Sequence, residues 1–212
     1  MPTGKKGLVA AIAALAVLLA AAIAGAIVFR GHQQRTEQRE IVALVADTTE
    51  QLRQVLATGS SREIVARIDG HLQNVKTVRN SALADAAEHY LLGAREIARR
   101  RADSDRLERE ATASRQALAS HMKRSGRRDT GWIRDAMDLQ KKVERDHAEL
   151  GRSLRTLDEL LYSLEDAEKR LAPHVDASLL LGNAARQAAR ERAQERAKRA
   201  ADELEKTRRI GS

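Results

Sequence analysis

A long heptad pattern constrains this chain more than any other feature of its sequence. From Ile133 to Leu171, twelve positions recur at alternating spacings of three and four residues, and eight of them are Leu, Ile or Val. Such a repeat, kept over about five heptads, places one apolar stripe along a helix and predicts coiled-coil packing. Seven of the positions form the predicted oligomer or packing seam: Val143, Leu150, Leu154, Leu157, Leu161, Leu164 and Leu171.

The composition also favours long helices over a globular core. The only prolines are Pro2 and Pro173, so none interrupts a helix between them. Charged residues make up 32% of the chain and aromatic residues 2%, although aromatic side chains normally supply much of a compact core. The absence of cysteine excludes disulfides and thiolate metal sites. These features predict an all-α protein, with a single N-terminal transmembrane helix followed by an elongated antiparallel coiled-coil or helical bundle.

The predicted transmembrane helix spans residues 7–29. The run contains 23 residues without a polar side chain. At 1.5 Å per residue it is about 34 Å long, enough to cross a bilayer core of about 30 Å. A cleaved signal peptide is the alternative, since Lys5 and Lys6 precede the run and residues 22–24 (AIA) could form a cleavage site. Apolar regions of signal peptides usually run about 7 to 15 residues, so an uncleaved anchor after a short basic tail (residues 1–6) is favoured.

Basic residues flank this run on both sides, so the positive-inside rule does not separate the two orientations. The tail that ends in Lys5 and Lys6 is typical of bacterial export signals. It favours a cytoplasmic N-terminus with the C-terminal body outside the cytoplasm. We therefore expect a single-pass membrane protein, with the bacterial inner membrane favoured. In outline the chain resembles singly anchored coiled-coil proteins of bacterial envelopes, although no motif links it to one family.

Breaks in the periodicity divide the remaining chain into three helical regions. Residues 30–79 are predicted as a helical hairpin (30–57 and 61–79), because Gly59 ends one apolar stripe and Ser60 with Glu63 forms a capping box for the next. Residues 81–172 are predicted as a long αα-hairpin (81–124 and 132–172, loop 125–131), with a solvated break at the polar stretch 99–106. Pro173 fits the first turn of a last helix, 173–212, whose thin alanine seam indicates loose packing, fraying or dependence on a partner.

No group of residues predicts catalysis or metal binding. The six histidines include no pair at a spacing of three or four, and His147, within the seam, is interpreted as a core or interface residue. Carboxylates such as Asp158 and Glu159 are typical of solvated helix faces, because catalytic acids need an enclosure that shifts their pKa. Neither a GxSxG turn nor a glycine-rich phosphate loop is present. The sequence therefore predicts no enzyme activity, no cofactor and no metal site.

The net charge of +8 is unevenly distributed. Residues 95–128 hold 11 basic and 5 acidic groups, whereas residues 129–172 hold 8 basic and 11 acidic groups. Neighbouring helices can complement each other in this way, which is the favoured interpretation, or the basic segments can bind a polyanion. Trp132, the only tryptophan, either caps the hairpin core or anchors a partner. Four cations at the predicted loop are either hydrated or form a polyanion contact: Lys123, Arg124, Arg127 and Arg128.

Together these patterns predict a membrane-anchored coiled-coil scaffold or tether that acts through protein–protein interaction. The expected partners are the lipid bilayer and either further copies of the chain or another coiled-coil protein. One alternative is a sensory or ligand-binding helical module that works with a separate signalling partner. The other is an anchored binder of anionic lipid or nucleic acid through the basic segments.

Overall fold

The computed structural model describes residues 35–59, 62–78, 82–123 and 129–211, and the chain divides into two compact units, Met1–Val42 and Ala43–Ser212. Residues 35–58 are helical, and residues 43–58 of this helix belong to the second unit. The described residues form helices without any strand, so the predicted all-α helical bundle is confirmed.

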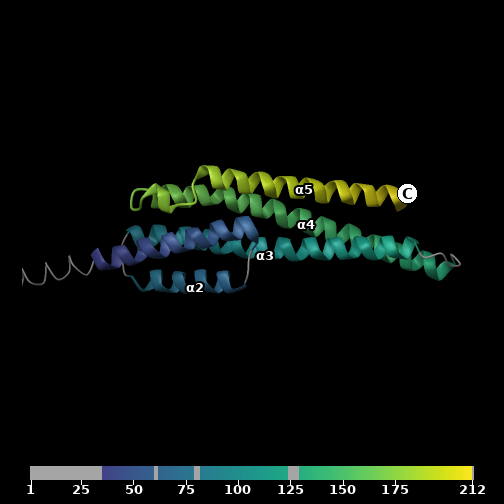
Figure 1. The fold of residues 1–212 in the computed structure, drawn as a ribbon, viewed down its shortest axis with the longest axis horizontal. Helices are drawn as coiled ribbons and strands as arrows, with labels where there is room; N and C mark the ends of the chain where they lie inside the picture. Colours follow the sequence, from purple (N-terminus) through teal and green to yellow (C-terminus); the bar gives the residue numbers. More distant parts are fainter. Residues whose placement is uncertain (1–34, 60–61, 79–81, 124–128, 212) are drawn as a thin grey trace, which may run out of the picture. The chain divides into compact units, whose positions relative to one another are not determined.

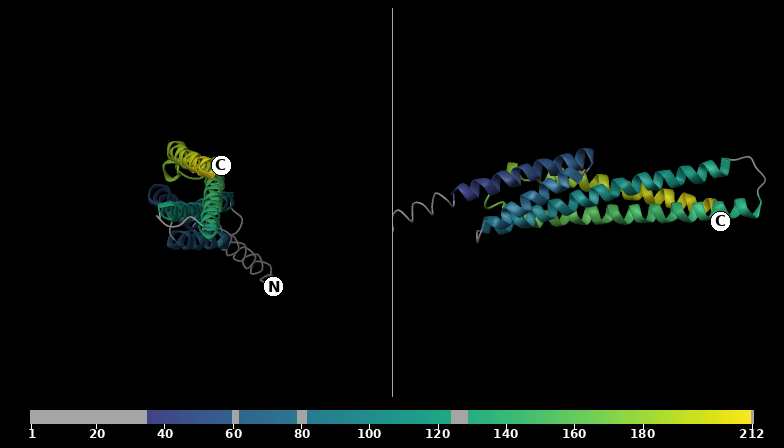
Figure 2. Two further views of the ribbon diagram at one scale, coloured as in Figure 1. Left: turned by 90° about the vertical axis from the view of Figure 1, so that its right-hand side faces the viewer. Right: turned by 90° about the horizontal axis from the view of Figure 1, so that it is seen from below.

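Within the described part of the second unit, long helices follow residues 43–58 in the order of the chain. α3 packs along α4, α4 along α5 and α2 against α3, and the views of Figures 1 and 2 agree on this arrangement. Helices that are neighbours in sequence are therefore neighbours in space, as in bundles with short connections. The elements are α2 (Arg62–Thr77), α3 (Ala82–Lys123), α4 (Thr130–Leu171), the 3-10 helix η1 (Ala177–Leu179) and α5 (Asn183–Gly211).

α3 and α4 form a long hairpin whose two arms each contain 42 residues. The sequence predicts arms at 81–124 and 132–172, but α4 already begins at Thr130. The reason is the helix cap: the Asp129 carboxylate accepts a hydrogen bond from the backbone N–H of Trp132 at 2.9 Å. Residues 124–128, most of the predicted loop, lie outside the described residues.

The predicted break at residues 99–106 is wrong, because α3 runs through this stretch without interruption. Ser104 is fully buried there, and its hydroxyl oxygen lies 2.9 Å from that of Ser153 on α4. Arg101 pairs with Asp105 one turn later at 3.3 Å. Hydrogen bonds and ion pairs offset the cost of burying these polar groups, so the helix continues where an apolar stripe is missing.

The sequence prediction places the start of the last helix too early. It expects a helix from Pro173, but the chain forms turns there. Asp176 caps η1 by accepting a hydrogen bond from the backbone N–H of Ser178 at 2.8 Å. Gly182 then takes a φ of +78°, a conformation that costs any residue with a Cβ atom. α5 starts only at Asn183.

α5 is attached to α4 by a buried ion pair and a seam of small residues. Arg186 and Glu168 are only 5% and 7% exposed and pair with each other, and Glu168 also accepts a hydrogen bond from the backbone N–H of Gly182 at 3.1 Å. α5 is helical to Gly211. Its small side chains let the two helices approach closely, and the buried ones are Ala189, Ala193 and Ala200.

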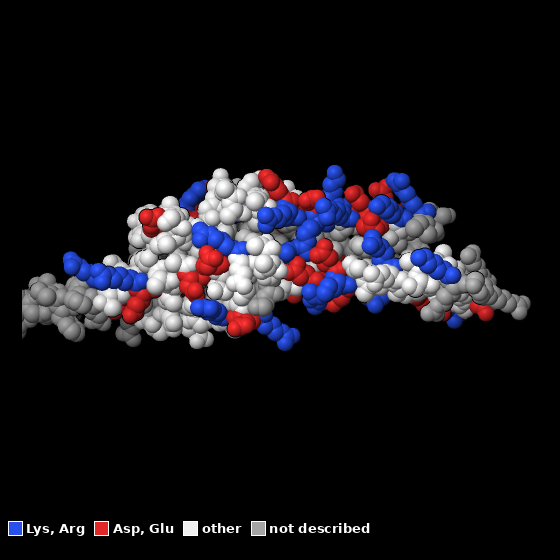
Figure 3. Space-filling model, in the orientation of Figure 1, with Lys and Arg blue, Asp and Glu red and all other residues white. Residues whose placement is uncertain are grey.

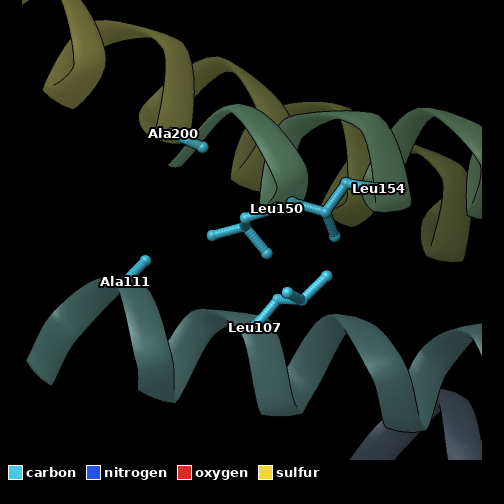
Figure 4. Packing of buried hydrophobic residues seen from close by; sticks show 5 residues of the cluster. All are labelled: Leu107, Ala111, Leu150, Leu154 and Ala200. Carbon is cyan, nitrogen blue, oxygen red and sulfur yellow. The ribbon is translucent and has the colours of Figure 1, made fainter. Parts of the chain in front are cut away.

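The middle of the hairpin packs around leucines. In Figure 4, Leu107 and Ala111 of α3 face Leu150 and Leu154 of α4, with Ala200 of α5 on the far side. Burying each leucine side chain contributes about 1.5–3 kcal/mol, while the alanines set how closely the helices approach. Three helices therefore share this part of the core.

Residues 43–58 and α2 add a second layer of packing against α3. The hydroxyl oxygens of Thr49 and Tyr90 lie 2.8 Å apart in a buried position. Burial raises the pKa of Tyr90 to about 12, so this hydroxyl stays protonated at neutral pH. The apolar cluster beside it contains Val55, Ile64, Ile68 and Ala98.

The predicted membrane localisation is contradicted. Across residues 35–59, 62–78, 82–123 and 129–211, every helix is too short or too polar to cross a bilayer. The two longest, α3 and α4, carry charged side chains along their whole length, which a bilayer core does not accommodate. The predicted transmembrane helix at residues 7–29 and the basic tail before it lie outside the described residues.

Candidate protein-interaction groove

An apolar groove opens near the end of the α3–α4 hairpin, which extends past the end of α5 in Figures 1 and 2. Its volume is about 910 Å³. Three of its side chains are large and apolar yet well exposed: Met122 by 40%, Ile133 by 49% and Met137 by 53%. The remaining apolar lining comes from Leu118, Ala119, Trp132 and Ala136.

The groove is the uncovered end of the heptad seam on α4. Ile133 and Val143 are both seam positions, but Val143 is fully buried. α5 accounts for this difference, because its last turns reach α4 near Glu144, where Arg208 lies 3.9 Å from the carboxylate. The first turns of α4, residues 130–142, therefore carry the seam into a region where α5 supplies only one edge of the groove.

An aromatic pair stiffens the hairpin beside the groove. The rings of His121 and Trp132 stack with centroids 4.9 Å apart and planes 22° from parallel. The His121 Nε2 atom also lies 3.1 Å from the backbone carbonyl oxygen of Trp132, to which it can only donate. Trp132 thus links the end of α3 to the start of α4 and lines the groove as well, as an amphipathic aromatic residue at an interface would.

The rim of the groove is charged, with an excess of basic groups. Arg115 and Lys206 both pair with one carboxylate, Glu203, at 2.9 and 2.8 Å. The hydrogen bonds from Lys206 and Arg115 lower the pKa of Glu203, so this carboxylate stays ionised. Lys141 adds another cation to the rim and Glu144 another anion. The described end of α3, residues 115–123, holds two basic residues and no acidic one, which adds to the positive charge near the groove.

The predicted seam residues lie inside the chain. Leu154, Leu161 and Leu164 are at most 1% exposed, and the remaining four are also buried: Val143, Leu150, Leu157 and Leu171. Leu164 packs so closely on α3 that a Cβ atom added at Gly93 would lie 2.9 Å from its Cδ1 atom. These seven residues pack the bundle of a single chain, and a role for them in oligomers stays a prediction.

Of the predicted polyanion contact, only Lys123 is described, as an exposed residue in the last turn of α3. Arg124, Arg127 and Arg128 lie outside the described residues. The earlier basic run behaves differently, because Arg99 lies 3.4 Å from Asp69 of α2 and Arg101 pairs within α3. Ion pairs with α2 and within α3 therefore neutralise part of the charge of this basic segment.

The sequence interpretation did not identify the groove: Met122 continues the partly regular apolar stripe of α3, four residues after Leu118, whereas Met137 lies outside the heptad positions of α4. A usable signal was present, since the seam continues upstream of Val143 through Ile133. Within the described ranges, no cluster of three or more histidine and acidic side chains is placed to hold a metal ion. Comparison of the chain with protein-family models, curated proteins and solved structures finds no match.

Proposed function

We propose that this chain is a helical scaffold that acts through protein–protein interaction, and that the groove binds an amphipathic helix of a coiled-coil partner. One observation supports this proposal most directly. The heptad seam of α4 passes without a change of register from covered positions such as Val143 to the open position Ile133. A partner helix in the groove would continue the role of α5 and bury its apolar stripe against Ile133, Met137 and Met122.

The charge around the groove specifies the partner further. Arg115 and Lys206 share the single carboxylate of Glu203, and Lys141 adds a third cation to the lining. A helix with acidic residues beside its apolar stripe would complement this rim and would bind faster than a basic one. A second copy of the chain would instead bring the basic residues at the end of α3, Arg115 and Lys123, against another basic rim.

Fluorescence anisotropy with two helical peptides tests the proposal on the full-length chain. Both peptides carry leucine at the seam positions over about three heptads, but one has glutamate and the other lysine at the flanking positions. We expect the acidic peptide to bind, and the basic peptide to bind about tenfold more weakly or not at all. The double variant Ile133→Asp/Met137→Asp should lose the acidic peptide, because it places two charges on the apolar floor.

Tyr162→Asp is the matched control, because Tyr162 is a 62% exposed apolar residue on the same helix that does not line the groove. Its binding of the acidic peptide should equal that of the wild type. Sedimentation of the unlabelled chain is measured in parallel. Self-association that is lost only in Ile133→Asp/Met137→Asp would make a second copy the occupant and overturn the choice of an acidic partner. Equal binding of the acidic peptide by Tyr162→Asp and by Ile133→Asp/Met137→Asp would show that the groove is not the binding site.

A ligand-binding helical module is the second candidate function. A separate pocket lined by arginines on α3 and α5 favours it.

A further inference from the structure

Four arginine side chains line one small pocket in the second unit, away from the apolar groove. The pocket has a volume of about 380 Å³ and lies where α5 passes α3, α4 and the end of residues 43–58. Glu195 is the only acidic residue in its lining, so the pocket wall carries a positive excess. The arginines are Arg101, Arg192, Arg196 and Arg199.

Three of these arginines come from one face of α5. Arg192, Arg196 and Arg199 follow one another at spacings of four and three, which places like charges next to each other on the helix surface. Figure 3 shows lysine and arginine side chains gathered along the middle of α5 where it passes α3, with acidic side chains among them. Carboxylates offset part of this repulsion, because Arg199 pairs with Glu195 and Arg196 with Asp105 and Glu108, whereas Arg192 forms no ion pair with the residues that the structure describes.

The arginines at the base of the pocket are incompletely neutralised. Arg101 and Arg196 approach the same oxygen of Asp105, at 3.3 and 3.0 Å, and Arg196 also pairs with Glu108 at 2.5 Å. Even so, the Nε atom of Arg101 and the Nη1 atom of Arg196 are buried without a hydrogen-bond partner. The carboxylates of Asp105 and Glu108 leave these two donors unused, and a rotation of each guanidinium group would offer them to an acceptor-rich ligand in the pocket.

The floor of the pocket is apolar. Leu157 and Ala193 are each 2% exposed, and the other apolar lining residues are Leu56, Ala57 and Ala189. Guanidinium groups bind phosphate oxygens in pairs, through short and strong hydrogen bonds. We propose that this arginine pocket binds a small phosphate-bearing molecule, with the phosphate on Arg101, Arg192 and Arg196 and any apolar part against Leu157.

Isothermal titration calorimetry on the full-length chain tests this site with two probes, inorganic pyrophosphate and hexyl phosphate. We expect saturable binding with one site per chain. Tighter binding of hexyl phosphate would identify a lipid-like ligand, and equal binding a free phosphate, and both results support the site. The variant Arg192→Gln should bind the better probe about tenfold more weakly, because one charge-assisted contact is lost.

Lys198→Gln is the matched control. Lys198 is exposed on the same helix and outside the pocket lining, so its loss changes the net charge equally. Arg192 is itself exposed, which makes a folding defect in Arg192→Gln easy to exclude by its melting temperature. The absence of binding by both probes to the wild type would overturn the proposal. Equal weakening by Arg192→Gln and Lys198→Gln would also overturn it, since binding would then follow net charge alone.

Discussion

Two stretches of α4 share one heptad seam but differ in what covers them. From Val143 to Leu171 the seam residues are buried, and α5 lies along the same helix. From Thr130 to Lys142 the pattern continues, yet Ile133 is half exposed and Met137 faces an open groove. A heptad pattern therefore predicts that an apolar stripe packs against another helix. It does not predict whether that helix belongs to the same chain.

The covered stretch also contains buried polar groups that pair with other helices. Glu168 occupies a seam position and is satisfied by Arg186 of α5 and by the backbone of Gly182. Ser153 is also buried, and its hydroxyl forms a hydrogen bond with that of Ser104 on α3. Such pairs fix the register of α3 and α5 on α4, whereas an apolar groove accepts a helix in several registers unless charges on its rim select one.

Breaking the buried pair should have the largest effect. We expect Glu168→Gln to lower the free energy of unfolding by about 3–5 kcal/mol, because Arg186 stays buried without its main counter-charge. Glu144→Gln at the groove rim should cost at most about 1 kcal/mol, because Glu144 is part of a long, partly exposed pair. Urea denaturation monitored by circular dichroism measures both variants. Similar losses for the two would show that the two stretches do not differ in how strongly they couple α5 to α4.

The helices could be predicted from the sequence wherever a pattern of neighbouring residues determines where a helix runs. The heptads of α4, the cap residues before it and the length match with α3 required no knowledge of tertiary partners. The predicted break in α3 failed for a different reason. Arg196, which meets Asp105 in this stretch, lies 91 residues further along the chain, and no periodicity within α3 can reveal it.

Truncating one leucine in the covered stretch should have the next largest effect. Leu154 is fully buried among three helices, so Leu154→Ala should destabilise the chain by about 2–5 kcal/mol through lost burial and a cavity. Met137→Ala in the open stretch should change stability by less than about 0.5 kcal/mol. Thermal denaturation at several protein concentrations distinguishes the two. A large and concentration-independent loss in Met137→Ala would show that the groove is covered within the chain.

The candidate sites were less predictable than the helices, and the reason is the geometry of helix ends. The groove depends on the register of α5 against α4, in which Arg208 lies beside Glu144 and α5 begins at Asn183 and not at Pro173. The arginine pocket depends on α3 and α5 meeting at Arg101 and Arg196. Arg101 lies in the basic segment 95–128 and Arg196 in the last predicted helix, 173–212, and that these two residues lie together could not be predicted without the fold.

His147 lies where the two stretches meet and should produce the smallest effect of the three. It is 7% exposed, and neither of its ring nitrogens has a hydrogen-bond partner. Burial lowers its pKa below 6.5, and Arg115 acts in the same direction, while Glu203 and Asp146 oppose them. The unfolded chain therefore takes up this proton at a higher pH than the folded chain. Stability should be intact above the unfolded pKa of about 6.5 and should fall as the pH drops below it.

The variant His147→Leu removes the titrating group and matches the apolar seam around it, so it should retain more of its stability between about pH 7 and 5.5 than the wild type. The gain cannot exceed about 1.4 kcal/mol per pH unit, the limit for one proton. Part of the acid sensitivity should remain, because burial lowers the pKa of His71 as well, despite the opposing charge of Asp47. His174→Leu, at an exposed position, is the control. If both variants follow the wild-type pH curve, the boundary between the covered and open stretches contains no buried neutral histidine, and α5 must lie further from α4 there.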